Sequence, residues 1–434
     1  MLMEHAHSPT GIAEDVAAAL CALPAGNEFN VRVVDTADSS VESLTPHNCK
    51  HSHFHAENTL SRRVLVLVSQ GDCLVAGLET REFVTLLVEI DGARVARERV
   101  SVDACIEKLD TSGMLSSRMP LARQMVAGYL CSLQKYRKAL DVSTVGVHLF
   151  ARAQHEYLFA KSQENPNKHI LDDFALIKWW QRTINSALTY AMSHLSYSLQ
   201  DSAIRSSGTS AVTRKCFSET VIGYCVIPGA EPNNAYAFTG EQADTANANS
   251  NEHADTKPAG RVEWRWGLPY SSDAVAHDCV LQFPDDPITR LLAEPHSRGW
   301  SVAMLLDMLS VSEECGSGHR AAYLSAWLPV KSFAEVLEAS QFEETADQGK
   351  LTLEDYDSML IALFDRAMDF STADAASTSS RRFIDFLDTT FNIKPVSVST
   401  TGPVIVKATT VSEQITTPLV NDLTAVIRKK RKAE

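Results

Sequence analysis

The chain has 434 residues, of which 44% are hydrophobic, enough to form one large domain or two ordinary ones. A formal net charge of −14 argues against a nucleic-acid binder, whose surface would be basic, but it suits a strongly basic partner. The nine cysteines form no CxxC pair, and no apolar run reaches the roughly 18 residues of a membrane span, so we expect a soluble intracellular protein with reduced thiols.

The first half of the chain alternates between strand and helix patterns. Apolar and β-branched runs predict strands near 62–70, 82–92 and 142–153, and helical periodicity predicts helices over 14–24 and 121–136. A Ser–Gly turn in "EKLDTSGML" separates the second strand from the second helix. This alternation predicts an α/β fold with a mixed central β-sheet that is flanked by helices on both faces.

Other segments predict little buried structure. Residues 229–261, rich in Ala, Asn, Asp and Thr, predict a disordered insertion loop, and 370–381 and 396–412 predict flexible connections. The histidines of "HNCKHSHFH" share one face of a strand, but no carboxylate or cysteine spacing supports a metal site, so we predict none. The basic run at 428–432, "RKKRK", fits equally a nuclear-import signal, a dock for an acidic surface, or a solvated tail.

Residues 165–192 carry a helical apolar stripe and two adjacent tryptophans. The stripe comprises Ile170, Phe174, Ile177, Ile184 and Leu188, with Trp180 on its flank and Trp179 on the opposite side. Packing against a second layer explains the outward tryptophan most simply, because large aromatic residues mostly serve cores. The other interpretation is that the pair walls a ligand site.

The segment "LQFPDDPITR" holds two aspartates between two prolines. Asp286 followed by Pro287 predicts a helix N-cap and a first helical position. One carboxylate suffices for a cap, so Asp285 is left unexplained. Two adjacent carboxylates also attract a basic chain, and one of them is a candidate proton acceptor, although capping would make Asp286 a poorer base.

The segments "LFARAQHEYLF", "NKHILDDFALIKWW" and "FPDDPITR" occur in this order and resemble the fungal histone acetyltransferase family called regulator of Ty transposition. "KLDTSGMLSSR" and the closing "TAVIRKKRK" resemble that family more loosely. The family is distantly similar in structure to the CBP-type acetyltransferases, so the resemblance implies a CBP-like fold. It runs from about residue 15 to the end of the chain apart from the insertion loop, and we expect one acetyltransferase domain over 10–434.

The resemblance implies transfer of an acetyl group from acetyl-CoA to lysines of newly made histone H-three, in company with histone H-four, without a metal. It also implies a nuclear location, chaperones of the nucleosome-assembly and anti-silencing types, and roles in chromatin assembly and the DNA damage response. Two other functions compete with it. A non-enzymatic histone-binding protein would need only the negative charge. A metal-dependent hydrolase could use the aspartate pair, but no GxxxxGK[ST] phosphate loop occurs.

The resemblance also implies site residues. Those expected at acetyl-CoA are Thr111, Arg118, Phe150, Ala153, Gln154, His155, His169, Ile170, Leu171, Trp179 and Arg290, with the two arginines at the phosphates. Those expected around the acetyl group and the lysine channel are Asp110, Tyr157, Trp180, Asp285 and Asp286. The tryptophan helix and the acidic turn should therefore converge on one cleft. Ile288 stands where the family carries a lysine that becomes acetylated on the enzyme itself.

Overall fold

The computed structural model describes residues 9–42, 44, 54–91, 94–115, 119–139, 142–204, 221–230, 262–284, 286–312, 315, 320–329 and 350–403. The chain divides into two units, Met1–Pro403 and Val404–Glu434, and all described residues belong to the first. Several predictions fall outside the described residues: most of the 229–261 loop, the basic run at 428–432, His51, His53, Arg118 and Asp285.

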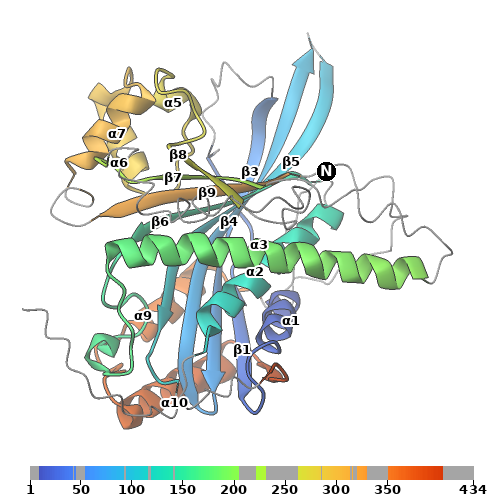
Figure 1. The fold of residues 1–434 in the computed structure, drawn as a ribbon, viewed down its shortest axis with the longest axis vertical. Coiled ribbons are helices and arrows are strands. Elements are labelled where there is room, and N and C mark those ends of the chain that lie inside the picture. The colour runs from blue at the N-terminus through green and yellow to red at the C-terminus, as the bar shows by residue number, and fades with distance from the viewer. Residues whose placement is uncertain are drawn as a thin grey trace, which may run out of the picture. The chain divides into compact units, whose positions relative to one another are not determined.

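The fold is built on a mixed sheet whose ten strands run in the order β10-β1-β3-β4-β5-β6-β9-β7-β8, with β2 beside β3 (Figure 1). The β5·β6 and β7·β8 pairs are parallel and the other pairs of named strands are antiparallel. The strands are β1 (Glu28–Asp35), β2 (Ser39–Val41), β3 (Phe54–Gln70), β4 (Cys73–Asp91), β5 (Arg94–Thr111), β6 (Val142–Arg152), β7 (Val221–Val226), β8 (Val262–Trp266), β9 (Ala321–Pro329) and β10 (Val396–Ser399).

Helices cover both faces of this sheet, as the sequence predicted. Along β3, Val64 and Val66 enter the core under α1, α2 and α3, whereas Leu65 and Leu67 enter the core under α9 and α10. Figure 1 shows these two groups of helices beside the sheet. Because successive side chains of a strand point to opposite faces, β3 contributes apolar side chains to the core on each face of the sheet. The helices are α1 (Pro9–Leu20), α2 (Leu121–Ala139), α3 (Asp173–Ile204), α5 (Ala276–Cys279), α6 (Pro287–Leu292), α7 (Val302–Ser310), α9 (Leu353–Leu363) and α10 (Ala373–Thr390), with short 3₁₀ turns η1 (Ser162–Glu164) and η4 (Pro295–Ser297).

The third core lies under α5, α6 and α7, over β7 and β9. It includes Ile288, which is buried, at the position where the resembling family carries a lysine. The apolar side chain therefore completes the packing between α6 and the sheet.

The prediction of weak structure is wrong for most of 370–381 and for 396–399, whereas residues 404–412 of the second segment lie outside the described residues. Residues 373–381 begin α10, because Thr372 caps the helix by accepting a hydrogen bond from Ala375 N. The small residues Ala376 and Ser380 let this helix approach the sheet, where Ser380 Oγ accepts a hydrogen bond from Leu74 N at 2.9 Å. Residues 396–399 form β10, which pairs with β1. The serines and threonines that suggested a loop are caps and close contacts.

A buried charge network crosses the centre of the sheet. Arg62 donates to Glu82 Oε2 through Nε and Nη2 at 3.0 and 2.8 Å, and to Asp35 Oδ2 through Nη1 at 3.1 Å. The side chains of all three residues are fully buried. Glu82 also accepts from Tyr129 Oη, whereas Asp35 Oδ1 has no hydrogen-bond partner among the described residues. Burial raises the pKa of Asp35 to about 7, although Arg62 opposes the shift.

Candidate active site

A cleft of about 310 Å³ opens where β5 and β6 end. These strands are parallel neighbours, so their carboxyl ends meet at the same edge, the usual place for a ligand in an α/β sheet. The first turn of α2, the loop after β6, residues 168–171 and the first turns of α3 complete the walls. The predicted residues that line the cleft are Asp110, Thr111, Phe150, Ala153, Gln154, His155, Tyr157, His169, Ile170, Leu171, Trp179 and Trp180.

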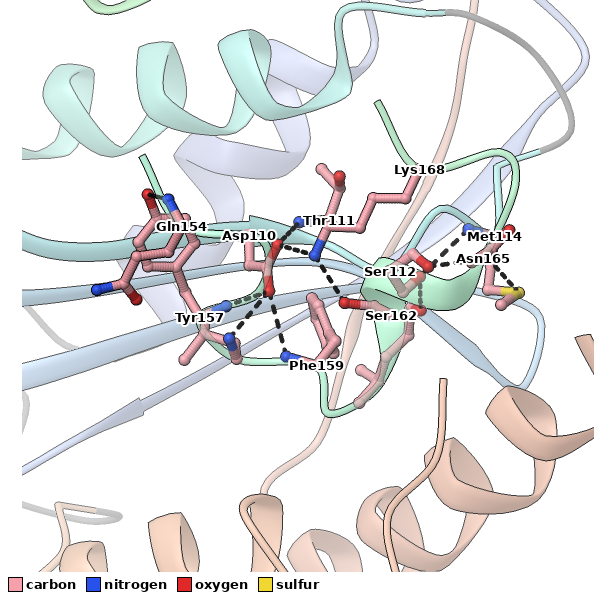
Figure 2. Close-up of polar contacts among 12 residues, drawn as sticks. Asp110, Thr111, Ser112, Met114, Gln154, Tyr157, Phe159, Ser162, Asn165 and Lys168 are labelled. Atoms are coloured by element: carbon pink, nitrogen blue, oxygen red, sulfur yellow. Dashed lines mark hydrogen bonds and ion pairs between the residues drawn. The ribbon is translucent and has the colours of Figure 1, made fainter. Parts of the chain in front are cut away.

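Asp110, the last residue but one of β5, holds the wall of the cleft together (Figure 2). Its Oδ1 accepts from Lys168 Nζ at 2.7 Å and from Thr111 N at 2.8 Å. Its Oδ2 accepts from the backbone N–H groups of Tyr157 and Leu158 at 2.8 and 2.9 Å. The side chains of Asp110 and Lys168 are about 95% buried. A carboxylate bound on both oxygens organises three segments rather than reacting with a substrate.

Tyr157 closes the loop that follows β6. Its hydroxyl donates to Arg152 O and accepts from Gln154 N at 3.0 Å, which pins residues 152–157 into a tight turn. Figure 2 shows Tyr157 beside Gln154. Burial raises the pKa of Tyr157 to about 12. The phenol is therefore neutral at physiological pH, and it can hold the loop and donate a hydrogen bond but cannot act as a base.

The two tryptophans of α3 have different surroundings. Trp180 is buried in the core under α1–α3, and Trp179 is half-buried, packs on the same core and also faces the cleft. Their rings meet edge to face at 5.0 Å. Trp179 thus packs on the core, as the first interpretation had it, and also lines a cleft, as the second had it. The helix begins at Asp173, so Ile170 is not part of its stripe as we predicted, but belongs to the preceding loop and is partly exposed.

Sequence reasoning missed a cationic group of the cleft, Arg123. It belongs to the first turn of α2, where the N–H groups of Ala122 and Arg123 lie at the positive end of the helix. The Nε of Arg123 is buried and has no hydrogen-bond partner among the described residues. An arginine at a helix N-terminus suits a phosphate. The signal was present in "MPLAR", where a proline precedes the helix and the arginine falls in its first turn.

The acidic turn forms a second, smaller cavity of about 40 Å³. Asp286 is the N-cap of α6, as predicted, and its Oδ1 accepts from Ile288 N at 2.7 Å, with Pro287 at the first helical position. The turn does not line the larger cleft. The two cavities share Leu149, and the ring of Phe150 in the cleft packs against that of Tyr323 in the second cavity, with centroids 4.7 Å apart and planes tilted by 37°.

Arg290, predicted to meet a phosphate, is exposed in α6 and lines neither cavity. Asp285 and Arg118 are outside the described residues. The predicted set therefore divides between the cleft, the second cavity, the exposed Arg290 that lines neither, and positions that the structure leaves undescribed. The cleft and the second cavity adjoin at Leu149 and do not form the single open cleft that we predicted.

A family model described as "Histone acetyltransferase KAT11-type domain" matches residues 134–386, more than half of the chain and the whole of β6, α3 and α6. The chain belongs to the KAT11-type histone acetyltransferase family. This confirms the resemblance to the fungal acetyltransferase family that the sequence motifs indicated.

Two relatives are named histone acetyltransferase rtt109. The chain is 30% identical to the one from Aspergillus flavus over 57% of its own length and 40% of the relative's length. It is 24% identical to the one from Schizosaccharomyces pombe over 67% of its own length and 69% of the relative's. The aligned region thus spans less than half of the Aspergillus flavus relative.

The fold of this KAT11-type chain is similar to the crystal structure of Rtt109 from Aspergillus fumigatus, with a TM-score of 0.63 and 21% identity, covering 90% of this chain and 99% of that chain. Within the described ranges, no group of His, Cys, Asp and Glu is placed to hold a metal ion. The described helices include none that is long and apolar enough to cross a membrane.

Proposed function

We propose that this KAT11-type chain transfers acetyl groups from acetyl-CoA to lysine side chains of newly made histone H-three, presented with histone H-four by chaperones of the nucleosome-assembly and anti-silencing types. Its setting is the nucleus, in chromatin assembly and the DNA damage response. The observation that carries the proposal is the cleft at the ends of β5 and β6, walled by Trp179 and by the first turn of α2, in a member of this family.

The cleft suits acetyl-CoA because it has an apolar wall and a cationic end. Trp179, Ile170 and Leu171 provide the apolar side chains for the pantetheine arm. Arg123 and the N-terminus of α2 provide donors for the phosphates. Asp110 binds Lys168 and the backbone of Tyr157, and so fixes the loop after β6 against the apolar wall. A rigid wall keeps the bound thioester in one position for attack by the amine.

The amine approaches from the second cavity. The Ile288 N–H group and the N-terminus of α6 stabilise the negative charge of the Asp286 carboxylate. This charge attracts the ammonium of the substrate lysine into the second cavity. The two cavities adjoin at Leu149 and Phe150, and we place the transfer at this junction, where the amine has to pass these side chains to reach the thioester. Excluding water there favours the neutral, attacking form of the amine.

The direct test is mass spectrometry of histones after incubation with the purified full chain, acetyl-CoA and each chaperone. We expect new acetyl groups on histone H-three. Asp286→Asn should abolish the transfer without unfolding the protein, since asparagine caps a helix as well as aspartate. A protein that binds histones but acetylates no lysine with any chaperone would instead be the acidic histone-binding protein.

A binding measurement separates cofactor recognition from chemistry. Saturating acetyl-CoA should raise the melting temperature, with about 2.7 kcal/mol of stabilisation at 100 times the dissociation constant. Trp179→Ala should weaken this effect, and Phe391→Ala, a change of the same kind at the end of α10, should not. An equal response of both variants would remove Trp179 from the site.

A further inference from the structure

Strand β6 presents a histidine to the second cavity that the proposed chemistry has not used. Leu149 and Val147 of this strand enter the core under α1–α3, so His148 points to the opposite face. It lines the second cavity together with Asp286, and its ring lies 5.1 Å from that of Phe283 and 5.0 Å from that of Trp327. Two aromatic neighbours therefore restrict the rotation of the imidazole.

Both ring nitrogens of His148 have partners that form a continuous chain. Nε2 lies 3.0 Å from Asp103 Oδ1 on β5, and Nδ1 lies 2.9 Å from Ser325 Oγ on β9. Asp103 Oδ2 accepts in turn from Ser101 Oγ at 2.9 Å. An ionised Asp103 places the proton of the neutral imidazole on Nε2, so Nδ1 accepts the hydroxyl proton of Ser325.

A glycine makes room for this pair. Gly146 is the register partner of Asp103 across the β5·β6 ladder. A Cβ at Gly146 would lie 2.5 Å from His148 Nε2 and closer still to Asp103 Oδ1, so any other residue would displace the contact. The absence of a side chain at Gly146 therefore leaves the space in which His148 and Asp103 form their contact.

The other groups around the second cavity are poor proton acceptors. The titratable ones are Asp103 and Cys105 on β5, Tyr323 on β9, Asp286 and Tyr270. Burial raises the pKa of the Cys105 thiol well above its usual range, so the thiol stays neutral. Asp286 accepts hydrogen bonds from Ile288 N and, at 3.4 Å, from Tyr323 Oη. Histidine is the residue type whose ordinary pKa, about 6.5, suits proton transfer at neutral pH.

The size of the cavity also limits what enters it. About 40 Å³ exceeds the space of one water but is far below the roughly 150 Å³ of a cavity that takes benzene. A cavity of this size suits the end of an unbranched amine side chain rather than a bulky group.

We propose that Ser325, His148 and Asp103 relay the proton of the substrate lysine away from the second cavity, an inference that rests on the proposed acetyl transfer. The ammonium, held by Asp286, donates an N–H to Ser325 Oγ. As the proton passes to that oxygen, the hydroxyl proton of Ser325 moves to His148 Nδ1. The neutral amine then attacks the thioester carbonyl and forms the C–N bond, the C–S bond breaks, and coenzyme A leaves as a thiolate that takes the remaining proton of the attacking nitrogen. Asp103 stabilises the imidazolium, which returns its proton through Ser325 to water once the product has left.

The test is the pH dependence of kcat/KM for histone H-three with the full chain, its chaperone and acetyl-CoA. In the wild type the rate should rise with pH and level off below the pKa of free lysine, about 10.4, because a positioned base removes the proton. In His148→Gln, kcat should fall by about 10²-fold or more, and the rate should keep rising beyond pH 8, toward the lysine's own pKa of about 10.4. Binding of acetyl-CoA should be unchanged.

Two further variants keep the test decisive if His148→Gln folds poorly. Asp103→Asn keeps the shape but donates to Nε2, which moves the imidazole proton to Nδ1, and it should lose at least tenfold in kcat. Ser325→Ala should lose a similar factor, while Ser310→Ala on α7 should keep wild-type rates. Wild-type pH profiles in folded Asp103→Asn and Ser325→Ala would overturn the relay. An inactive wild type would instead overturn the proposed acetyl transfer.

Discussion

The buried network at Asp35 makes the stability of the fold depend on pH in an unusual direction. One guanidinium, that of Arg62, serves two carboxylates, and Glu82 takes two of its three donors. The folded-state pKa of Asp35 is raised from 3.8 to about 7. The folded protein therefore keeps a proton that the unfolded chain releases, so this contribution to stability is complete below about pH 4 and is lost as the pH rises to 7.

The size of the effect follows from the shift. A rise from 3.8 to about 7 corresponds to roughly 4 kcal/mol at about 1.36 kcal/mol per pKa unit. Roughly 3 kcal/mol of it falls between pH 5 and 8. Asp35→Asn removes the titration, and its amide can both accept from Arg62 and fill the place of the unpartnered Oδ1. The variant should match the wild type near pH 5 and exceed its stability at pH 8.

The assay is urea unfolding of both proteins, followed by tryptophan fluorescence from pH 5 to 8. Histidine titrations elsewhere contribute equally to both proteins, so the difference between them isolates Asp35. Asp388→Asn is the matched control, because Asp388 makes a partly exposed ion pair with Arg32 and should contribute less than about 1 kcal/mol. A difference that stays flat, or a wild type that gains on the variant as the pH rises, would refute the reasoning.

Three other outcomes are expected. Arg123→Gln should raise the KM for acetyl-CoA about tenfold with little change in kcat, as steady-state kinetics will measure, since it removes a phosphate donor used equally before and during reaction. Lys168→Met should destabilise the fold by about 3–5 kcal/mol in urea unfolding, because it leaves the buried carboxylate of Asp110 without its cation; Lys161→Met, at an exposed pair, should do far less. Gly128→Ala should cost about 1–3 kcal/mol or more by the same method, because its Cβ would lie 2.5 Å from Val16 Cα on α1.

Local structure was predicted correctly where neighbouring residues in the sequence determine it. The residues flanking Asp286 restrict the backbone, so the cap and the start of α6 were predicted correctly. Sequence reasoning failed where polar residues serve a distant surface. The serines of α10 suggested a loop. Ser380 is in fact buried and accepts a hydrogen bond from Leu74 N, which lies 306 residues earlier in the chain.

The sequence by itself determined the class of fold, the position of β6, most of the apolar stripe of α3, and the family, because period, caps and motifs are local properties of the chain. Only the tertiary structure decided which chemical groups meet. It joined Asp110 to Lys168, brought Arg123 to the cleft, moved Asp286 to a separate cavity, and set His148 between Asp103 and Ser325. Those meetings depend on strand register and helix packing between segments far apart in the chain, which a local pattern does not specify.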